Sequence, residues 1–330
     1  MRPFEYVRVT DAQTGVSAAS EHPGARFIAG GTNLLDLMKE DVERPTRLVD
    51  LGALPLRQIQ RSRSGLVLGA LASNSETANH PLVREHYPLL TQAIVAGASG
   101  QLRNMATNGG NLMQRTRCQY FYDTTLPCNK RAPGSGCGAR DGLNRGHAIL
   151  GWSEACVATY PGDMANALYA LDARIRVRGV NGRERLIPVG EFHRLPGDTP
   201  ERDNQLLQGE LITALELPAA AGDFARHSYY LKVRDRASYA FAMVAVAVGL
   251  ELEGDRIRQA RLVLGGVAHK PWRSLAAEDA LRGRRIDAES FELAAKLALE
   301  GAQPLAHNGY KIELGRRAVA RALAQAAQLA

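Results

Sequence analysis

The sequence predicts a protein of mixed helices and sheets, built in two parts that meet near residue 220. Three observations support this prediction. Apolar strands and amphipathic helices are interspersed over the first part, and an Asn-Gly turn joins two strands near residue 180. The last part contains a long apolar hairpin followed by helices. Between the two parts, the small residues at 219–222 are the predicted linker.

The first strand leads into a glycine pair and then into a helix. Strand 26–29 is followed by Gly-Gly-Thr-Asn at 30–33 and by an amphipathic helix at 34–39. Glycines let the backbone approach an anion, and consecutive N–H groups before a helix can bind a phosphate. A plain tight turn explains the same residues, and neither a Rossmann nor a P-loop spacing is present. Both interpretations stay open for this loop alone.

A second glycine pair follows farther along the chain. Strands at 47–50 and 65–70 and a helix at 88–95 lead to Thr-Asn-Gly-Gly-Asn at 107–111. Each glycine pair is followed by Asn and then Leu. Because a dinucleotide carries two phosphates, two backbone loops of this kind favour a dinucleotide-binding site more strongly than one loop does.

All four cysteines lie in the next loop, at positions 118, 128, 137 and 156, among Lys, Arg, Pro and Gly residues. This composition neither packs a core nor forms a periodic helix. Four thiols in one loop, in a chain with none elsewhere, indicate that something holds them together. A metal centre or the nearby Lys and Arg residues could supply the positive charge that thiolates need.

Three structures could use these cysteines. Disulfides usually serve small exported chains, whereas this chain has 330 residues and begins without a signal-peptide pattern. Structural zinc favours tight Cys pairs, but the gaps here are nine, eight and eighteen residues. A 4Fe-4S cube takes one thiolate per iron, and a long wrapped loop can supply them. We therefore expect a cluster, with Cys156 alone also suiting an ordinary buried thiol.

The rest of the chain shows clear elements. A helix at 164–171 begins after Asp163, which is placed either to cap it or to accept a hydrogen bond from a ribose or flavin. The remaining strands are expected at 174–178, 184–189, 210–218, 227–234, 240–252 and 257–267, and the final helices at 274–281, 287–299 and 311–327. Four histidines stand singly in loop-like contexts, where we expect surface or structural roles: His80, His147, His193 and His307.

Composition excludes several classes of protein. The chain is 45% apolar and 23% charged, as is ordinary for a globular protein. The net charge is +7, but the basic residues are dispersed and aromatic residues make up 6%, so we expect no nucleic-acid partner. No apolar run approaches the ~20 residues of a membrane span. Without an export signal of its own, the chain is expected in the cytoplasm unless a partner carries it elsewhere.

The glycine and cysteine motifs together resemble a known family. The runs at 29–33 and 107–111 are similar to the two FAD-diphosphate signatures of the flavin subunits in the xanthine dehydrogenase and carbon monoxide dehydrogenase (molybdenum hydroxylase) family. The resemblance covers essentially the whole chain. Within this family, the segment 114–137 resembles the extra iron–sulfur loop of the FAD/4Fe-4S subunits of periplasmic aldehyde oxidoreductases, which most members lack.

The resemblance implies an α+β fold: a two-lobed FAD-binding domain of vanillyl-alcohol-oxidase (PCMH) type and a C-terminal domain of sheet and helices. The expected boundaries are 1–220, with lobes 1–56 and 57–220 and an iron–sulfur loop at 114–156, and 224–330. The cofactors implied are FAD and a 4Fe-4S cluster with ligands Cys118, Cys128, Cys137 and Cys156. The FAD contacts implied are Phe27, Ile28, Ala29, Gly30, Gly31, Thr32, Asn33, Leu34, Thr107, Gly109, Gly110, Asn111, Asp163, Ile212 and Lys232. For Lys232, an exposed lysine at a strand edge is the alternative.

The implied function is electron transfer in a heterotrimeric, molybdenum-dependent aldehyde oxidoreductase. Electrons would come from a molybdopterin-binding large subunit through the 2Fe-2S clusters of a small subunit, and would leave to an external acceptor. The implied location is periplasmic, by export with a signal-bearing partner. We predict no catalytic residue in this chain.

Two other functions are weighed against this one. A cluster- or zinc-stapled scaffold would bind partner subunits without flavin chemistry. A free-standing flavin oxidase would need an acid–base set of His, Tyr or Glu side chains, and the sequence shows no convincing one.

Overall fold

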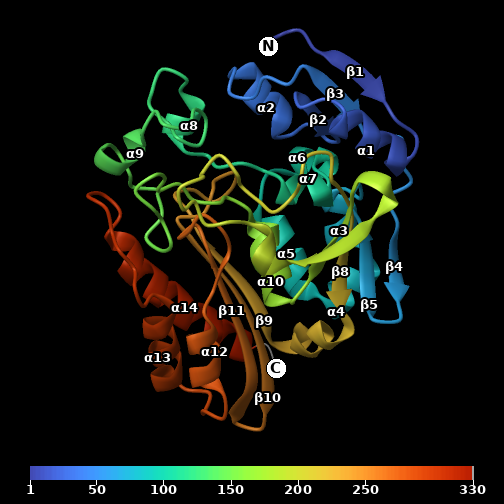
Figure 1. Ribbon diagram of the computed structural model, residues 1–330. Coiled ribbons are helices and arrows are strands. Elements are labelled where there is room, and N and C mark those ends of the chain that lie inside the picture. The colour runs from blue at the N-terminus through green and yellow to red at the C-terminus, as the bar shows by residue number, and fades with distance from the viewer. Residues whose placement is uncertain (329–330) are drawn as a thin grey trace.

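The structure is a computed structural model that describes residues 1–328, and it contains three sheets (Figure 1). The mixture of helices and strands confirms the predicted class. The last two residues of the expected 224–330 domain lie outside the described residues. None of the described helices is long and apolar enough to cross a membrane.

The N-terminal lobe is a small parallel sheet with strand order β1-β3-β2. Its apolar core includes Val9, Val16 and Val49. The Asp11 carboxylate caps the first helix by accepting a hydrogen bond from the Thr14 N–H at 2.8 Å. The elements are β1 (Glu5–Arg8), α1 (Ala12–Ser20), β2 (Ala25–Ile28), α2 (Leu34–Lys39) and β3 (Arg47–Asp50).

The second lobe is an antiparallel sheet with strand order β4-β5-β8-β6-β7, packed against short helices. Its strands are β4 (Ile59–Ser62), β5 (Gly65–Gly69), β6 (Arg174–Arg178), β7 (Glu184–Pro188) and β8 (Leu211–Pro218). Its helices are α3 (Asn74–Asn79), α4 (Pro81–His86), α5 (Pro88–Ala96), α6 (Gly100–Met105), α7 (Asn108–Leu112), α10 (Asp163–Ala170) and α11 (Val189–Phe192). The predicted hairpin is confirmed: β6 pairs with β7 across a 3₁₀ turn, η1 (Val180–Gly182), in which Asn181 and Gly182 both have positive φ.

The C-terminal sheet lies between two layers of helices, because successive side chains along β10 (Val244–Glu253) are apolar and point to opposite faces of the sheet. Val246 and Val248 point into the core shared with the last three helices, whereas Ala245 and Ala247 point into the core shared with α5 and α10. The remaining elements are β9 (Ser228–Val233), β11 (Arg256–Gly265), β12 (Trp272–Arg273), α12 (Leu275–Leu281), α13 (Ala288–Ala298) and α14 (Tyr310–Gln328).

The predicted linker at 219–222 lies between β8 and β9, and its Ala219 and Ala220 are exposed. It begins a 3₁₀ segment, η2 (Ala219–His227), which buries Ala221 and Phe224. The guanidinium of Arg261 lies over the Phe224 ring. This segment therefore packs against both the second lobe and the C-terminal sheet.

The cysteine loop lies outside the sheets and carries two single-turn helices, α8 (Gln119–Tyr122) and α9 (Gly138–Asp141) (Figure 1). Phe121 is fully buried and packs with Leu37 of α2 and with Cys128. The Arg131 guanidinium donates hydrogen bonds to the Tyr120 and Phe121 carbonyls at 2.7 and 2.8 Å. The loop is thus ordered by its own basic and aromatic residues, and it packs on the N-terminal lobe.

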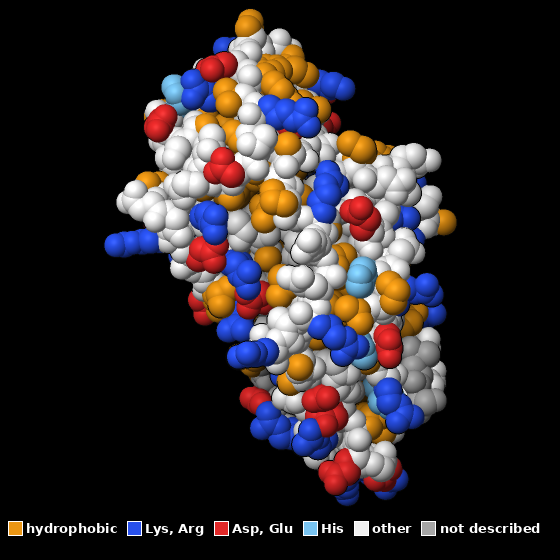
Figure 2. All heavy atoms as spheres, turned by 90° about the vertical axis from the view of Figure 1, so that its right-hand side faces the viewer, with side chains coloured by type: hydrophobic (Ala, Val, Ile, Leu, Met, Phe, Trp, Pro, Cys, Tyr) orange, Lys and Arg blue, Asp and Glu red, His pale blue; other side chains and the backbone are white. Residues whose placement is uncertain are grey.

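Basic and acidic side chains are interspersed on the face of the molecule drawn in Figure 2, with apolar side chains scattered between them. That face carries no continuous basic surface.

The end of the cysteine loop is attached to the C-terminal helices by buried polar groups. The Asn308 amide donates to the His147 and Ala148 carbonyls at 3.2 and 3.1 Å and accepts from the Leu305 N–H at 2.6 Å. Next to it, the buried Lys311 ammonium donates to the carbonyls of Gly146, His147 and Gly266.

We expect Asn308→Ala to lower the free energy of unfolding by about 2–3 kcal/mol, because it leaves buried backbone groups without partners. Urea denaturation followed by the fluorescence of Trp152 and Trp272 measures this, since both lie in this part of the protein. His307→Ala removes the neighbouring exposed side chain and is the matched control, with an expected change within ~0.5 kcal/mol. Equal effects of both variants would contradict the prediction.

Candidate functional site

A cavity of about 430 Å³ lies between the N-terminal lobe and the second lobe. Both predicted glycine loops line it, together with part of the segment 201–212. The predicted cofactor-binding residues that it brings together are Phe27, Ile28, Ala29, Gly30, Gly31, Thr32, Asn33, Leu34, Thr107, Gly109, Gly110 and Ile212. We call it the first cavity.

The two glycine loops touch, and this contact explains the first glycine pair. A Cβ added to Gly30 would lie 1.9 Å from the Met105 carbonyl oxygen, two residues before Thr107. Gly31 has φ +71°, a conformation that other residues rarely adopt. Any side chain at position 30 would therefore push the loops apart.

The loops differ in what their backbones offer to a ligand. The N–H groups from Gly30 to Asn33 have no hydrogen-bond partner among residues 1–328. In the second loop, the Gly109 N–H donates to the Ala70 carbonyl at 2.8 Å, and the Gly110 N–H to the Thr107 hydroxyl at 3.2 Å. The first loop therefore has the free N–H donors of an anion-binding nest. In the second loop the glycine N–H groups are already bonded, so its glycines mainly let the backbone come close to a ligand.

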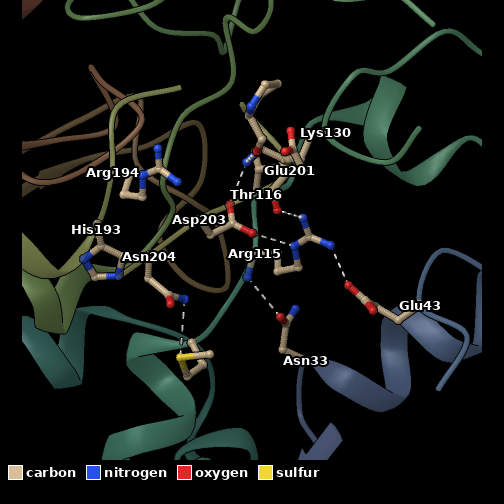
Figure 3. A network of polar contacts seen from close by, with 12 residues as sticks. Asn33, Glu43, Arg115, Thr116, Lys130, His193, Arg194, Glu201, Asp203 and Asn204 are labelled. Carbon is tan, nitrogen blue, oxygen red and sulfur yellow. Dashed lines mark hydrogen bonds and ion pairs between the residues drawn. The ribbon is translucent and has the colours of Figure 1, made fainter. Parts of the chain in front are cut away.

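An ionic network holds one wall of the first cavity in place (Figure 3). The Arg115 guanidinium donates to Asp203 at 2.7 Å and to Glu43, and its backbone N–H donates to the Asn33 side-chain oxygen at 3.0 Å. The buried Lys130 ammonium donates to Asp203 at 2.6 Å. The network thus joins the N-terminal lobe, the cysteine loop and the segment around Asp203.

Asp203 is ionised because of its two cationic neighbours. Burial by itself would raise the pKa of Asp203, but Arg115 and Lys130 outweigh burial and hold that pKa at about 2. The Asn33 side-chain amide nitrogen, in contrast, is buried without a partner in the described chain. It is available to a ligand of the first cavity.

Three predicted cofactor-binding residues lie outside the lining of the first cavity. The Asn111 amide donates to the Asn74 side-chain oxygen at 2.8 Å. Asp163 accepts from the Lys232 ammonium at 2.7 Å and from the Tyr230 hydroxyl at 2.8 Å. Lys232 is therefore a buried partner of Asp163, and the alternative of an exposed strand-edge lysine is wrong.

The prediction that Asp163 caps its helix is also wrong. Asp163 is the first residue of α10, Gly162 occupies the cap position, and no side-chain cap bond forms. Burial raises the pKa of Asp163, and Lys232 partly offsets that effect. The side chain is directed at Lys232 because a buried carboxylate needs a charged partner more than a helix end needs a cap.

Asp163 borders a second cavity, of about 390 Å³. Cys118 and His147 from the cysteine loop and Phe241 and Met243 from the C-terminal part also line it. It therefore lies where the second lobe, the cysteine loop and the C-terminal sheet meet.

All four cysteines line a third, small cavity of about 10 Å³, and all four are free thiols. Cys128 and Cys137 face each other in an isolated antiparallel bridge, and Gly134 and Gly136 between them have positive φ. The disulfide alternative is therefore wrong for this structure.

The arrangement does not resemble a site for one ion. Residues 1–328 contain no group of three or more His, Cys, Asp or Glu side chains placed to hold a metal ion. A zinc site needs such a group. Cluster ligands bind four different irons, so they surround a wider space. Burial raises the pKa of Cys118 to about 12 and that of Cys156 to about 11, so metal binding must displace their protons.

His147 touches one of these thiols. Its Nε2 lies 3.1 Å from the Cys118 Sγ, and the imidazole is buried. Burial lowers the pKa of His147 to about 4, so the ring is neutral at pH 7. The sequence indicated only a surface or structural role, because the two residues are 29 positions apart in a loop without periodicity.

Sequence reasoning did not find the ionic network either. The sequence shows Lys and Arg residues near the cysteines, but it gives no signal for Glu43 or Asp203 as their partners. Arg115 and Asp203 are 88 positions apart, and Lys130 and Asp203 are 73 apart. No local pattern could have paired them.

Comparisons with known proteins agree along the whole chain. Residues 2–220 match the family described as the FAD binding domain in molybdopterin dehydrogenase, and residues 229–326 match the CO dehydrogenase flavoprotein C-terminal domain. The chain is 48% identical to the aldehyde oxidoreductase FAD-binding subunit PaoB of Escherichia coli strain K12, with 99% of each chain covered. It is 26% identical to the glyceraldehyde dehydrogenase medium chain of Sulfolobus acidocaldarius, covering 93% of this chain and 91% of that one.

Two solved structures are similar in fold. Quinoline 2-oxidoreductase from Pseudomonas putida 86 matches with a TM-score of 0.76, and carbon monoxide dehydrogenase from Hydrogenophaga pseudoflava with 0.77. Each is 25% identical to this chain, and each comparison covers 99% of this chain and 98% of the other.

The pKa of Asp203 predicts how the network responds to acid. The folded pKa of about 2 lies below the ordinary value of 3.8, so the stabilisation is complete above pH 3.8 and is lost as the pH falls toward 2. We expect the free energy of unfolding of the wild type to fall by about 2 kcal/mol over this range because Asp203 becomes protonated. The Asp203→Asn variant should lack this part of the pH dependence. Denaturant titrations between pH 5 and 2 measure it. Asp198→Asn, an exposed aspartate of the same segment, is expected to follow wild type.

Proposed function

The chain belongs to the family of FAD-binding flavoprotein subunits of molybdenum-type oxidoreductases, and from this membership we propose that it carries FAD and a 4Fe-4S cluster in an aldehyde oxidoreductase. The family match and the likeness of fold confirm the expected FAD-binding domain of PCMH type with a C-terminal domain. The division at 1–220 and 224–330 stays our proposal, as do the lobe and loop boundaries within it.

The first cavity suits the diphosphate of FAD. The free N–H groups from Gly30 to Asn33 and the unpartnered Asn33 amide offer donors to an anion, and Thr32 and Thr107 line the same space. Ile212 adds apolar surface. When bound, FAD supplies the redox chemistry, and this chain binds, orients and shields it.

Asp163, Lys232 and Asn111 have a different place in the proposal. Asp163 borders the second cavity, and Lys232 holds it there through the buried ion pair. We propose that these residues contact a part of the cofactor that extends beyond the first cavity. Their buried polar groups would orient that part without taking part in bond making.

The four cysteines support the cluster. They are the whole cysteine content of the chain, and they line one cavity. Burial raises the pKa of the Cys156 thiol, and the buried Lys130 ammonium lies near enough to offset part of that rise. A 4Fe-4S cluster takes four thiolates, and its net negative charge is stabilised by a buried cation. The cluster supplies one-electron chemistry when bound.

We propose a molybdopterin-binding large subunit and a 2Fe-2S small subunit as partners in a heterotrimer. This subunit would receive electrons from them and pass them to an external acceptor. The supporting observation is that the similar proteins are described as FAD-binding subunits or medium chains of such oxidoreductases. Export to the periplasm together with a signal-bearing partner belongs to the same proposal.

The observation that carries the proposal is the meeting of both glycine loops at one cavity, with the cysteine loop packed on the same lobe. The direct test is cofactor analysis of the native complex, purified through a tag on this chain. We expect one FAD and, in addition to the iron of the 2Fe-2S clusters in the small subunit, about four irons with acid-labile sulfide for each copy of this chain. A complex that still assembles but contains no FAD would instead support the scaffold function.

Gly30→Ala tests the FAD site. Its Cβ would collide with the Met105 carbonyl and separate the two loops, so we expect FAD retention to weaken at least about tenfold, or about 1.4 kcal/mol. Gly100→Ala is the control, because a Cβ there meets nothing within 4 Å. Released flavin is measured by fluorescence after gel filtration, and circular dichroism verifies folding. Full FAD content in Gly30→Ala would refute the assignment of this loop.

Cys137→Ser tests the cluster separately. Cys137 lines the third cavity, whereas the first cavity is lined by other residues, so we expect loss of the four irons and the sulfide that this chain holds, with FAD and the 2Fe-2S iron retained. Asp141→Ala changes an exposed side chain of the same loop and should keep both cofactors. Iron content unchanged in Cys137→Ser would rule out a four-cysteine cluster.

A further inference from the structure

The imidazole of His147 is held against one proposed cluster ligand by the rest of the fold. The His147 N–H donates to the Asn144 carbonyl at 3.0 Å, and the His147 carbonyl accepts from Lys311 at 2.9 Å and from Asn308 at 3.2 Å. The Tyr120 ring lies 6.3 Å away, centroid to centroid. With both sides of the peptide anchored, the ring has little freedom to leave the Cys118 sulfur.

The chemistry of Cys118 decides which atom donates in this contact. A free thiol can give its own proton to the imidazole, whereas a thiolate bound to iron can only accept. The proton must then be on His147 Nε2, which lies 3.1 Å from the sulfur. His147 Nδ1 has no partner in the described chain, so placing the proton on Nε2 breaks no other hydrogen bond.

We propose that His147 donates a hydrogen bond from Nε2 to the Cys118 sulfur and thereby raises the reduction potential of the cluster. The inference rests on the proposed 4Fe-4S centre. Reduction adds negative charge to the cluster and its sulfur ligands, and an N–H donor stabilises that charge. His147 is thus a positioning residue that tunes electron transfer without binding iron.

The position of Cys118 gives this contact a function. Among the four cysteines of the described chain, Cys118 lines both the third cavity and the second, whereas the others line only the third. His147 also lines the second cavity. The hydrogen bond therefore lies on the side of the cluster that faces the Asp163 cavity, where the potential matters for exchange of electrons with a neighbouring group.

The test compares three variants in the native complex by redox titration monitored by electron paramagnetic resonance. His147→Phe keeps a ring but removes the donor, and we expect a tenfold shift of the reduction equilibrium toward the oxidised cluster, which is about 59 mV for one electron. His147→Gln keeps a side-chain N–H and should restore most of the potential. His269→Phe is the control, because that buried histidine bonds to the Arg194 carbonyl and not to a cysteine.

The outcomes separate the two proposals. Absence of iron and sulfide beyond those of the 2Fe-2S clusters in the wild-type complex would refute the proposed cluster itself. A cluster present with the same potential in wild type and His147→Phe would refute the role of His147. If His147→Phe loses iron, His147→Gln decides: a retained cluster of near wild-type potential supports the hydrogen bond, and loss from both variants overturns it in favour of packing alone.

Discussion

The buried ionic network around Arg115 is the contact on which the arrangement of the sites depends. Asp203 lies between two cations, Arg115 and Lys130, and Arg115 also binds Glu43 and packs over the Phe121 ring at 4.7 Å. Removing one member of such a network leaves an unpaired buried charge, which is costly. The network therefore fixes the relative positions of three segments: the N-terminal lobe, the cysteine loop and the segment that carries Asp203.

A consequence is that one short piece of chain passes along all three cavities. Arg115 borders the first cavity, Thr116 the second and third, and Cys118 again the second and third. The Thr116 hydroxyl donates to the Thr159 carbonyl at 2.9 Å and accepts from the Cys118 N–H at 3.3 Å, so this piece is fixed along its length. The proposed flavin site and the proposed cluster are thus connected through a few residues of backbone.

The cysteine loop is anchored at its far end by different means. Asn308 and Lys311, from the C-terminal part, bind backbone carbonyls at 146–148. The anchor at the Arg115 network is made of ion pairs, whereas the anchor at 146–148 is made of hydrogen bonds to backbone carbonyls. Between these two anchors, the loop surrounds its thiols with its own glycine, asparagine and arginine residues. A loop with so little apolar content would otherwise lack the burial needed to order it.

Local chemistry was enough to predict most of the elements, the two glycine loops and the cysteine loop from the sequence by itself, although β1, α1, β4 and α6 were missed. Apolar periodicity, an Asn-Gly turn and a glycine pair before a helix all act over a few residues, so the hairpin at Asn181 and the loop at Gly30 were found correctly. Only the tertiary structure decided that Asp163 pairs with Lys232 and leaves its cap, that Arg115 meets Asp203, and that His147 rests on Cys118. Burial sets those choices, because a charge or polar atom taken out of water needs whichever partner the packed chain brings to it, however distant that partner is in sequence.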